Sequence, residues 1–468
     1  MKTVISNMIR ITDPTEDVKA YLNTLKLPNP EYEKKQRMGF WLGRTPKEIR
    51  MYEWDGNTVV LPFGLLKEVW PMIRIYPFET DFRQNEVINY GEMTGLYDYQ
   101  KKAVQSMIDA KYGILKSPAG SGKTQCGIAM IMRIQRKTLW LCHTADLLHQ
   151  SMERAERYIP DEWIGTITEG KINIGKGITF ATIQTMCNTD LDRYRHEWDV
   201  VIVDECHRIS QSATTVSRYQ KVLNNLAARH KYGLTATPER SDGLIRATYS
   251  LIGPIAYEVP EESVKDKIMT VTVRPVETET EITEDCLNTD GTIDYGKLIA
   301  HLTTDEKRNR LIASCIQENR GHSCLILSDR LEHLDTIRKM LPEDIIQESG
   351  AVSGKMTTKA GKELREQYIE EMRTGKTKYL FATYSLAKEG LDIPRLDRLF
   401  MVSPVKFSSV VIQSIGRIAR TFEGKENPVC YDFVDKNIGF CERAYKERCK
   451  HYRKIHCTIE RGFLKDDG

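Results

Sequence analysis

From about Tyr99 onward, short runs of β-branched and apolar residues alternate with amphipathic segments of helical length. Apolar runs of four or five residues between turn signals predict buried strands, and residues 124–136 carry apolar positions at helical spacing. This alternation predicts an α/β fold with a parallel sheet. The candidate strands of this stretch are Tyr112–Leu115, Thr138–Cys142, Ile178–Ala181, Asp199–Val203 and Tyr232–Thr235.

A second alternation of the same kind follows an acidic stretch. Residues 277–294 (ETETEITEDCLNTDGTID) are rich in Thr and poor in large apolar side chains, so they predict an exposed connector or insertion. The candidate strands of the second alternation are Cys324–Leu327, Tyr379–Ala382, Leu399–Val402 and Val429–Phe433. Two similar α/β lobes in tandem are therefore expected.

The first 90 residues have a different pattern, with Trp41, Trp54 and Trp70 between turn signals such as Asp55-Gly56. They predict a small mixed or β-rich domain. The expected organisation is an accessory domain at 1–92, lobe one at 93–262, lobe two at 263–440 and a basic helical extension at 441–468.

Composition adds limits on the class of protein. A chain of 468 residues is expected to form two or three domains, and 40% hydrophobic with 28% charged residues is ordinary for a soluble protein. No apolar run approaches the roughly 18 residues of a membrane span, and no signal-type segment opens the chain. Eleven scattered cysteines without a CxxC pair favour a reducing cytoplasm. A net charge of +3 allows a nucleic-acid partner only through a local basic surface.

The most informative stretch is Ser117-Pro-Ala-Gly-Ser-Gly-Lys-Thr124, between a predicted strand and a predicted helix. A glycine loop at a helix N-terminus directs backbone N–H groups at one point, which suits a polyphosphate. Lys123 is expected to reach the β- and γ-phosphates, and the Thr124 hydroxyl to ligate Mg²⁺. Ser117 replaces the first glycine of the usual GxxxxGK[ST] pattern, so a chance glycine-rich turn is the alternative. The residues assigned to phosphate binding are Ser117, Pro118, Ala119, Gly120, Ser121, Gly122, Lys123 and Thr124.

An acidic pair, Asp204-Glu205, ends the apolar run Val201-Ile-Val203. Ligands of parallel sheets lie at the carboxyl ends of strands, so the pair is expected in the same crevice as Lys123. Asp204 would hold Mg²⁺ through water, and Glu205 would orient and deprotonate the attacking water. The alternative is a solvated strand end.

Three motifs in order resemble those of superfamily 2 helicases. Asp204-Glu-Cys-His207 is similar to motif II, Thr235-Ala-Thr-Pro238 to motif III, and Gln413-Ser-Ile-Gly-Arg-Ile-Ala-Arg420 to motif VI. The resemblance covers about residues 96–435. It implies two RecA-like lobes, ATP hydrolysis with Mg²⁺, and a nucleotide held between the lobes. The longer form LTATPxRxDG resembles the DExH group directed at DNA, which includes the motor subunits of restriction enzymes.

The resemblance also implies roles for single residues. Gln413, Arg417 and Arg420 would act at the γ-phosphate, and the spacing of the two arginines predicts that both project from one helix face. Gly390 and Asp392 match motif V beside the nucleotide, and Gln100 matches the glutamine that reads adenine. His207, Thr235 and Thr237 would couple the ATP site to nucleic-acid binding.

Strand contacts are expected from residues that match the remaining family motifs, namely His143, Thr144, Thr182, Gln184 and Thr383. Short hydroxyl side chains and helix N-termini at such positions suit backbone phosphates. A metal site at His143 and His149 is the alternative that we set aside.

The N-terminal region resembles the accessory domain of compact, often phage-encoded helicases of the UvsW type. Its basic and aromatic residues predict contact with a DNA backbone or an unpaired base. The members of this patch are Lys34, Lys35, Arg37, Trp41 and Arg44. A solvated charged face over a small aromatic core is the alternative. The basic stretch 443–461 would either follow phosphates or pack on lobe two.

The sequence therefore predicts a cytoplasmic ATP-dependent DNA helicase that unwinds or branch-migrates forks and junctions, in phage recombination, replication or repair. The rivals are a double-stranded DNA translocase that remodels protein–DNA complexes and an ATP-switched recruitment module. RNA is a weaker alternative as substrate.

Overall fold

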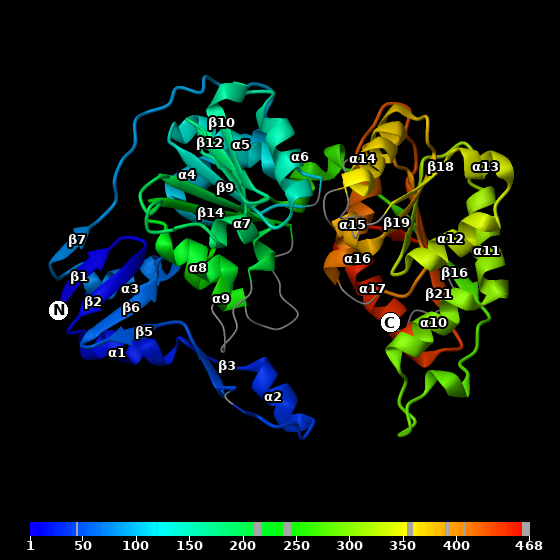
Figure 1. The fold of residues 1–468 in the computed structure, drawn as a ribbon, viewed down its shortest axis with the longest axis horizontal. Helices are drawn as coiled ribbons and strands as arrows, with labels where there is room; N and C mark the ends of the chain where they lie inside the picture. Colours follow the sequence, from blue (N-terminus) through cyan, green and yellow to red (C-terminus); the bar gives the residue numbers. More distant parts are fainter. Residues whose placement is uncertain are drawn as a thin grey trace. The chain divides into compact units, whose positions relative to one another are not determined.

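The computed structural model describes residues 1–43, 45–118, 120–209, 217–236, 245–352, 359–388, 391, 393–405 and 408–460. Two compact units make up the chain, Met1–Ser263 and Val264–Gly468 (Figure 1). Each unit is built around its own large sheet.

The first unit begins with a five-stranded mixed sheet in the order β5-β6-β2-β1-β7. β1 pairs antiparallel with β2 and parallel with β7. Alternate residues such as Ile9, Ile11, Val59 and Leu61 are fully buried, which gives this sheet its own core. The elements are β1 (Lys2–Ile5), β2 (Met8–Thr12), α1 (Glu16–Asn23), β5 (Glu53–Asp55), β6 (Thr58–Pro62), η1 (Phe63–Leu65), α3 (Leu66–Ile73) and β7 (Phe78–Thr80).

A short segment leaves this sheet between α1 and β5. It consists of β3 (Lys26–Pro28), α2 (Pro30–Arg37) and β4 (Glu48–Arg50), and β3 pairs antiparallel with β4. None of the residues of α2 is buried. Leu27 and Ile49 at the base of the segment pack with Ala247.

The second part of the first unit is an eight-stranded sheet in the order β11-β10-β12-β9-β13-β14-β8-β15. All neighbouring strands are parallel except β10 and β11. The strands are β8 (Tyr112–Lys116), β9 (Thr138–Cys142), β10 (Ile164–Thr168), β11 (Lys171–Asn173), β12 (Ile178–Thr182), β13 (Val200–Asp204), β14 (His230–Thr235) and β15 (Ile255–Glu258). The five predicted strands correspond to β8, β9, β12, β13 and β14.

Helices cover both faces of this sheet (Figure 1). Gly127 of α5 lies on the Trp140 ring, where a Cβ would approach ring carbon to 2.6 Å. Leu139 and Leu141, which point to the other face, join the core under α7, α8 and α9. The helices are α4 (Asp98–Ala110), α5 (Lys123–Ile134), α6 (Ala145–Ala155), η2 (Asp161–Trp163), α7 (Ile183–Cys187), η3 (Cys206–Arg208), α8 (Arg218–Asn225), α9 (Ile245–Ile252) and η4 (Glu261–Lys267).

The small mixed domain packs directly on the eight-stranded part. Gly64 approaches α9 so closely that a Cβ would lie 2.3 Å from the carbonyl oxygen of Tyr249. Arg246 of α9 forms a 2.8 Å ion pair with Glu68 of α3. A glycine at this contact allows two backbones to meet.

The second unit contains a seven-stranded parallel sheet in the order β18-β19-β17-β20-β21-β16-β22. Its strands are β16 (Thr272–Thr278), β17 (Cys324–Ser328), β18 (Ser349–Val352), β19 (Tyr379–Thr383), β20 (Arg398–Met401), β21 (Val429–Asp435) and β22 (Thr458–Ile459). Its helices are η5 (Glu284–Cys286), α10 (Tyr295–Thr304), α11 (Glu306–Gln317), α12 (Leu331–Lys339), α13 (Glu343–Gln347), α14 (Lys359–Thr374), α15 (Tyr384–Lys388), α16 (Ser408–Ile418) and α17 (Gly439–Lys454). The two large sheets, one wholly and one mostly parallel, and the small mixed domain confirm the predicted α/β architecture.

The acidic stretch 277–294 is only in part a connector. Thr278 is buried at the end of β16, where its hydroxyl donates to Asp435 at 2.6 Å. Most of residues 281–294 are exposed, as expected.

The basic C-terminal helix α17 packs on the sheet of the second unit. Arg448 is buried and donates two 2.8 Å hydrogen bonds to Asp432, which also accepts from the Tyr452 hydroxyl. The inner face of α17 therefore belongs to the core of this unit, which agrees with the predicted packing on lobe two. Across the described ranges, no helix combines the length and the apolar character needed to cross a membrane.

Candidate nucleotide-hydrolysis site

The predicted phosphate loop connects β8 to the first turn of α5. Gly120 and Gly122 have φ angles of 82° and 81°, which favour glycine. The Ser117 N–H donates to the carbonyl of Thr235 on the neighbouring strand at 3.0 Å. The Ser121 hydroxyl donates to the Pro118 carbonyl at 2.6 Å. The loop is thereby fixed on the sheet, whereas Ala119 lies outside the described residues.

Gln100 of α4 lies under this loop rather than in solvent. It is buried, its Nε2 donates to the Ser121 carbonyl at 3.1 Å, and its Oε1 accepts from the Tyr97 N–H at 3.0 Å. A Cβ at Gly122 would lie 2.5 Å from Gln100 Nε2. Tyr99 supports the same carbonyl with a 2.9 Å hydrogen bond from its hydroxyl. Gln100 thus stabilises the loop through its Nε2, while its Oε1 caps the first turn of its own helix α4.

Asp204 is the last residue of β13, and its carboxylate is buried at the carboxyl end of the sheet. It accepts hydrogen bonds from the Ser151 hydroxyl at 3.2 Å and from the Glu205 N–H at 3.0 Å. Burial and the neighbouring Glu205 raise the pKa of Asp204 to about 6, while the Lys123 ammonium opposes the rise. Asp204 and Lys123 are therefore close enough to interact electrostatically, as the sequence predicts.

The Thr124 hydroxyl accepts a 3.1 Å hydrogen bond from Arg154 of α6. Burial lowers the pKa of this guanidinium, and Asp204 counteracts the shift. Sequence reasoning missed both Ser151 and Arg154. The signal available in the sequence was their spacing of three residues on α6. The other inward residues of this helix are Leu147, Leu148 and Ala155.

The oxygen atoms beside the phosphate loop fit a magnesium ion. Mg²⁺ takes one or two protein oxygens, waters and phosphate oxygens. The Thr124 hydroxyl and the buried Asp204 carboxylate, which interacts electrostatically with Lys123, make up such a set.

Glu205 follows Asp204 in a left-handed conformation, with φ of 46°. This conformation is strained for a residue with a side chain, and such strain is often retained at functional positions. His207 Nδ1 lies 3.1 Å from Glu205 Oε2 and 3.0 Å from Thr235 Oγ1. One imidazole thus connects the predicted catalytic carboxylate to the predicted coupling threonine. Thr237 lies outside the described residues.

The predicted strand-contact residues of the first unit gather at the ends of β9 and β12. Gln184 Nε2 donates to the His143 carbonyl at 2.8 Å, and Thr144 caps α6 by accepting from the Leu147 N–H at 3.4 Å. Thr182 donates to Thr185 at 3.1 Å. Within the described part of the chain, His143 Nδ1 and Gln184 Oε1 are buried without a hydrogen-bond partner. Burial and nearby Arg208 lower the pKa of His143 to about 4, so this ring is neutral near pH 7.

In the second unit, Gln413 and Arg417 lie on α16. Gln413 is buried, and its Oε1 has no hydrogen-bond donor among the described residues. Arg417 Nη1 donates to the Leu391 carbonyl at 3.0 Å. Because an amide oxygen accepts hydrogen bonds, the missing partner of Gln413 is a donor such as water or a guanidinium.

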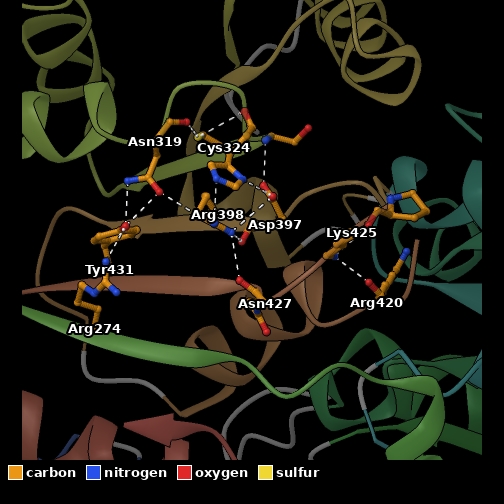
Figure 2. A network of polar contacts seen from close by, with 12 residues as sticks. Arg274, Asn319, Cys324, Asp397, Arg398, Arg420, Lys425, Asn427 and Tyr431 are labelled. Carbon is orange, nitrogen blue, oxygen red and sulfur yellow. Dashed lines mark hydrogen bonds and ion pairs between the residues drawn. The ribbon is translucent and has the colours of Figure 1, made fainter. Parts of the chain in front are cut away.

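The expectation that Arg417 and Arg420 share a helix face is wrong. α16 ends at Ile418, and Arg420 lies beyond it in an isolated bridge with Ile268. Figure 2 shows how the backbone of Arg420 is held: Lys425 Nζ donates to the Arg420 carbonyl at 2.7 Å and to the Pro394 carbonyl at 3.1 Å. Burial lowers the pKa of Lys425 to about 8. The arginine is positioned by a lysine that sequence reasoning missed.

A network of polar contacts surrounds the start of β20. Arg398 donates to Asn319 at 2.9 Å and to the Asn427 carbonyl at 3.2 Å, and Asp397 lies 2.6 Å from His322 (Figure 2). These contacts fix the loops that flank β20 and β21. Thr383, at the end of β19, shares a 2.8 Å hydrogen bond with Ser385. Gly390 and Asp392 lie outside the described residues.

The predicted N-terminal patch lies on and after α2. Trp41 is 89% exposed and Phe40 60% exposed. Lys34 and Arg37 are exposed, whereas Lys35 is paired with Glu31 at 2.8 Å. Residues 26–50 contain seven Lys or Arg and three Glu, so this segment is more basic than the whole chain. Arg44 lies outside the described residues.

Comparisons with known proteins agree with this geometry. A model described as type III restriction enzyme, res subunit, matches residues 93–240, and one described as helicase conserved C-terminal domain matches residues 306–422. The putative ATP-dependent RNA helicase L396 of Acanthamoeba polyphaga mimivirus is 24% identical over 78% of this chain and 68% of its own. The DNA 3'-5' translocase XPB2 of Sulfurisphaera tokodaii is 25% identical over 69% of this chain and 78% of its own.

Among solved structures, a putative HsdR subunit of a type I restriction enzyme from Vibrio vulnificus has a TM-score of 0.56 at 17% identity. The match covers 86% of this chain and 76% of that one, and shows a shared fold. T4 UvsW aligns over 98% of both chains at 17% identity, with a TM-score of 0.41 that is too low to support a shared substrate.

Proposed function

Because the chain belongs to helicase superfamily 2, we propose that it is an ATP-driven motor that unwinds or translocates along DNA. The observation that carries the proposal is the contact of His207 with both Glu205 and Thr235, beside the phosphate loop. This contact joins a group suited to hydrolysis with the strand that leads to the rest of motif III. A site built only to bind nucleotide would not need this link.

For hydrolysis, we assign the phosphates to the loop 117–122 and to the Lys123 ammonium. Mg²⁺, when bound by Thr124 and through water by Asp204, would neutralise phosphate charge. Glu205 accepts a proton from the attacking water as its oxygen bonds to the γ-phosphorus and the bond to the ADP oxygen breaks. We assign adenine recognition to Gln100, whose amide would have to exchange one of its present hydrogen bonds.

The second unit is proposed to supply charge for the transition state. Planar guanidinium groups of Arg417 and Arg420 suit the spread negative charge of a transferring phosphoryl group. Gln413, Gly390 and Asp392 are assigned to the same nucleotide. Alternating grip by the two units would then move the motor along one strand.

We propose DNA as the nucleic acid, with contacts from His143, Thr144, Thr182, Gln184 and Thr383. The relative named a DNA translocase and the restriction-enzyme model support DNA over RNA. Forks and junctions are the proposed structures, in phage recombination, replication or repair. The support is the projecting basic segment 26–50, where Trp41 is exposed as a partner for an unpaired base.

The test is ATP turnover on a panel of single-stranded, duplex, forked, four-way and RNA substrates. We expect the strongest stimulation on forks or four-way DNA. Lys123→Ala should abolish turnover without unfolding the protein, and Glu205→Gln should bind ATP but not hydrolyse it. Persistent DNA-stimulated hydrolysis by Lys123→Ala would refute the site.

A second candidate is a double-stranded DNA translocase that displaces bound protein without separating strands, since one relative is named a translocase. Parallel strand-displacement and triplex-displacement assays distinguish the two: a translocase displaces the triplex only. Slow turnover that ignores DNA structure would instead favour an ATP-switched recruitment module. Stronger stimulation by RNA would favour the activity named for the mimivirus relative.

A further inference from the structure

A cavity of about 540 Å³ opens in the second unit, and neither Arg417 nor Arg420 is among its lining residues. It lies at the carboxyl ends of β17 and β20, between α10 and α17, which share a small apolar core. This volume falls in the range of about 300–1,000 Å³ typical of small-molecule sites. The carboxyl ends of parallel strands are also where such sheets bind ligands.

The floor of the cavity is apolar, and its mouth carries aromatic rings. Ile299, Val405 and Val410 are buried beneath it. Tyr295 and Phe440 stand together, with ring centroids 5.7 Å apart and planes tilted by 58°. Tyr295 remains 48% exposed although its hydroxyl is anchored to the Pro404 carbonyl at 3.4 Å. An anchored aromatic ring with an open face suits stacking by a planar ligand.

Two charged side chains lie at the same mouth. The Asp329 N–H donates to Ser403 at 3.0 Å, and the exposed Asp329 carboxylate also accepts a hydrogen bond from the Tyr295 hydroxyl, which holds it beside the aromatic ring. Arg330 Nη2 donates to the Gly296 carbonyl at 3.1 Å, which ties the guanidinium to the first turn of α10. A carboxylate accepts and a guanidinium donates hydrogen bonds, so the mouth can match a ligand edge that carries both kinds of group.

We propose that this cavity binds a guanine base unstacked from the nucleic-acid strand. The proposal rests on the nucleic-acid binding proposed above. A base offers a flat face to Tyr295, and a pocket closed by apolar side chains accepts its ring. Guanine is the base whose N1–H and N2–H groups together match one carboxylate, here Asp329, while its O6 accepts from Arg330.

The position of the cavity links base binding to the motor. Tyr384 lines the cavity and follows Thr383, a predicted strand contact, on the chain. Val410 lines it from α16, the helix that carries Gln413 and Arg417. A base in the cavity therefore touches the helix proposed to act on ATP.

The experiment compares strand binding with and without a single guanine. Fluorescence anisotropy would be measured on short oligothymidine, on the same strand with one central guanine, and on one with an abasic site there. We expect tighter binding of the guanine strand by the unmodified protein. Tyr295→Ala should weaken binding of the guanine strand about tenfold and leave binding of the other strands unchanged. Tyr295→Phe should keep the affinity for the guanine strand. Asp329→Asn should reduce the preference for guanine over thymine.

A second probe does not depend on strand binding. Photolabelling with 8-azidoguanosine monophosphate should mark peptides that contain Tyr295 or Phe440, and Tyr295→Ala should reduce that label but not label near Lys123. Equal affinity for the guanine and thymine strands, or no label at the cavity, overturns the proposal. Failure of all strands to bind would refute the proposed function instead, whereas label at the cavity in that case would assign it to a free guanine nucleotide.

Discussion

At the scale of single residues, His207 occupies the position where hydrolysis and nucleic-acid binding can be coupled. Its Nδ1 is within 3.1 Å of a Glu205 oxygen and within 3.0 Å of the Thr235 hydroxyl. The imidazole can satisfy only one of them at a time with a single N–H. A change of partner would therefore transmit the state of Glu205 to β14.

His207→Ala should separate the two activities. We expect ATP turnover without DNA to remain within a few-fold of that of the unmodified protein. Stimulation by DNA should fall about tenfold, a factor that corresponds to a typical coupling energy. His207→Gln, whose amide can donate to one partner, should recover part of the stimulation. Steady-state ATP turnover with and without forked DNA measures both quantities. Undiminished stimulation in His207→Ala would contradict the coupling role.

Lys231 is the second residue with an unusual environment. It is 1% exposed on β14, its Nζ donates to the Leu223 carbonyl at 2.9 Å, and it lies 4.9 Å from the centroid of the Phe63 ring. Burial lowers the pKa of Lys231 to about 7 from its ordinary 10.5. The unfolded chain therefore binds more protons than the native protein between about pH 7 and 10.5, and stability should rise with pH there.

Lys231→Met should flatten this pH dependence. The slope of the unfolding free energy that the lysine contributes is at most about 1.4 kcal/mol per pH unit. Chemical denaturation at several pH values measures it, with Lys102→Met on the exposed side of α4 as the control. A slope unchanged by Lys231→Met would show that this lysine is charged in the native state.

At the scale of elements, the sequence predicted those strands that a short local pattern of apolar residues determines. The strands recovered, such as β9 and β13, are continuous apolar runs buried on both faces. The strands missed include β11, which is wholly exposed, and β16, which contains Pro275. Their positions depend on pairing with distant segments, as when β16 pairs with β21, and no local pattern carries that information.

The candidate site divides in the same way. Motif residues such as Lys123 and Asp204 were found because spacing on a strand–loop–helix unit is local. Arg154 and Lys425 were missed because only tertiary packing brings them to the Thr124 hydroxyl and the Arg420 carbonyl. The end of α16 before Arg420 was also missed, since the sequence around it continues a helical pattern.

The contact between the mixed domain and α9 gives a prediction for an element. Gly64→Ala would place a Cβ 2.3 Å from the Tyr249 carbonyl oxygen, and two backbones must then move apart. We expect the free energy of unfolding of Gly64→Ala to fall by about 1–3 kcal/mol, as it does when a core is overpacked. Gly439→Ala, where the nearest atom is Arg443 Nη1 at 3.6 Å, is the matched control.

Thermal unfolding and limited proteolysis provide the measurement. Gly64→Ala should expose cleavage sites in residues 1–80, while peptides of the second unit keep their protection. A melting temperature equal to that of Gly439→Ala would show that the contact is dispensable.

At the scale of the whole molecule, each unit has its own core, and the second unit also contains buried charge pairs. In the second unit, Arg308 and Asp435 are fully buried and joined at 2.7 Å, and Arg308 also donates to the Val402 carbonyl at 2.8 Å. Such a pair keeps the strand ends of this unit in a defined arrangement. Function is proposed to require both units, since the phosphate loop belongs to one and the motif VI arginines to the other.

If the phosphate loop of the first unit and the arginines of the second unit act on the same nucleotide, variants of the second unit should change the rate of ATP hydrolysis. Arg417→Ala or Arg420→Ala should lower kcat by about 10³-fold or more, the effect of losing an arginine finger, with little change in KM for ATP. Lys425→Met should give a smaller loss in the same direction, because it removes only the support of the Arg420 carbonyl. Arg443→Ala on the exposed face of α17 is the control. DNA-stimulated ATP turnover measures these effects, and a kcat equal to that of the control in both arginine variants would show that hydrolysis needs the first unit alone.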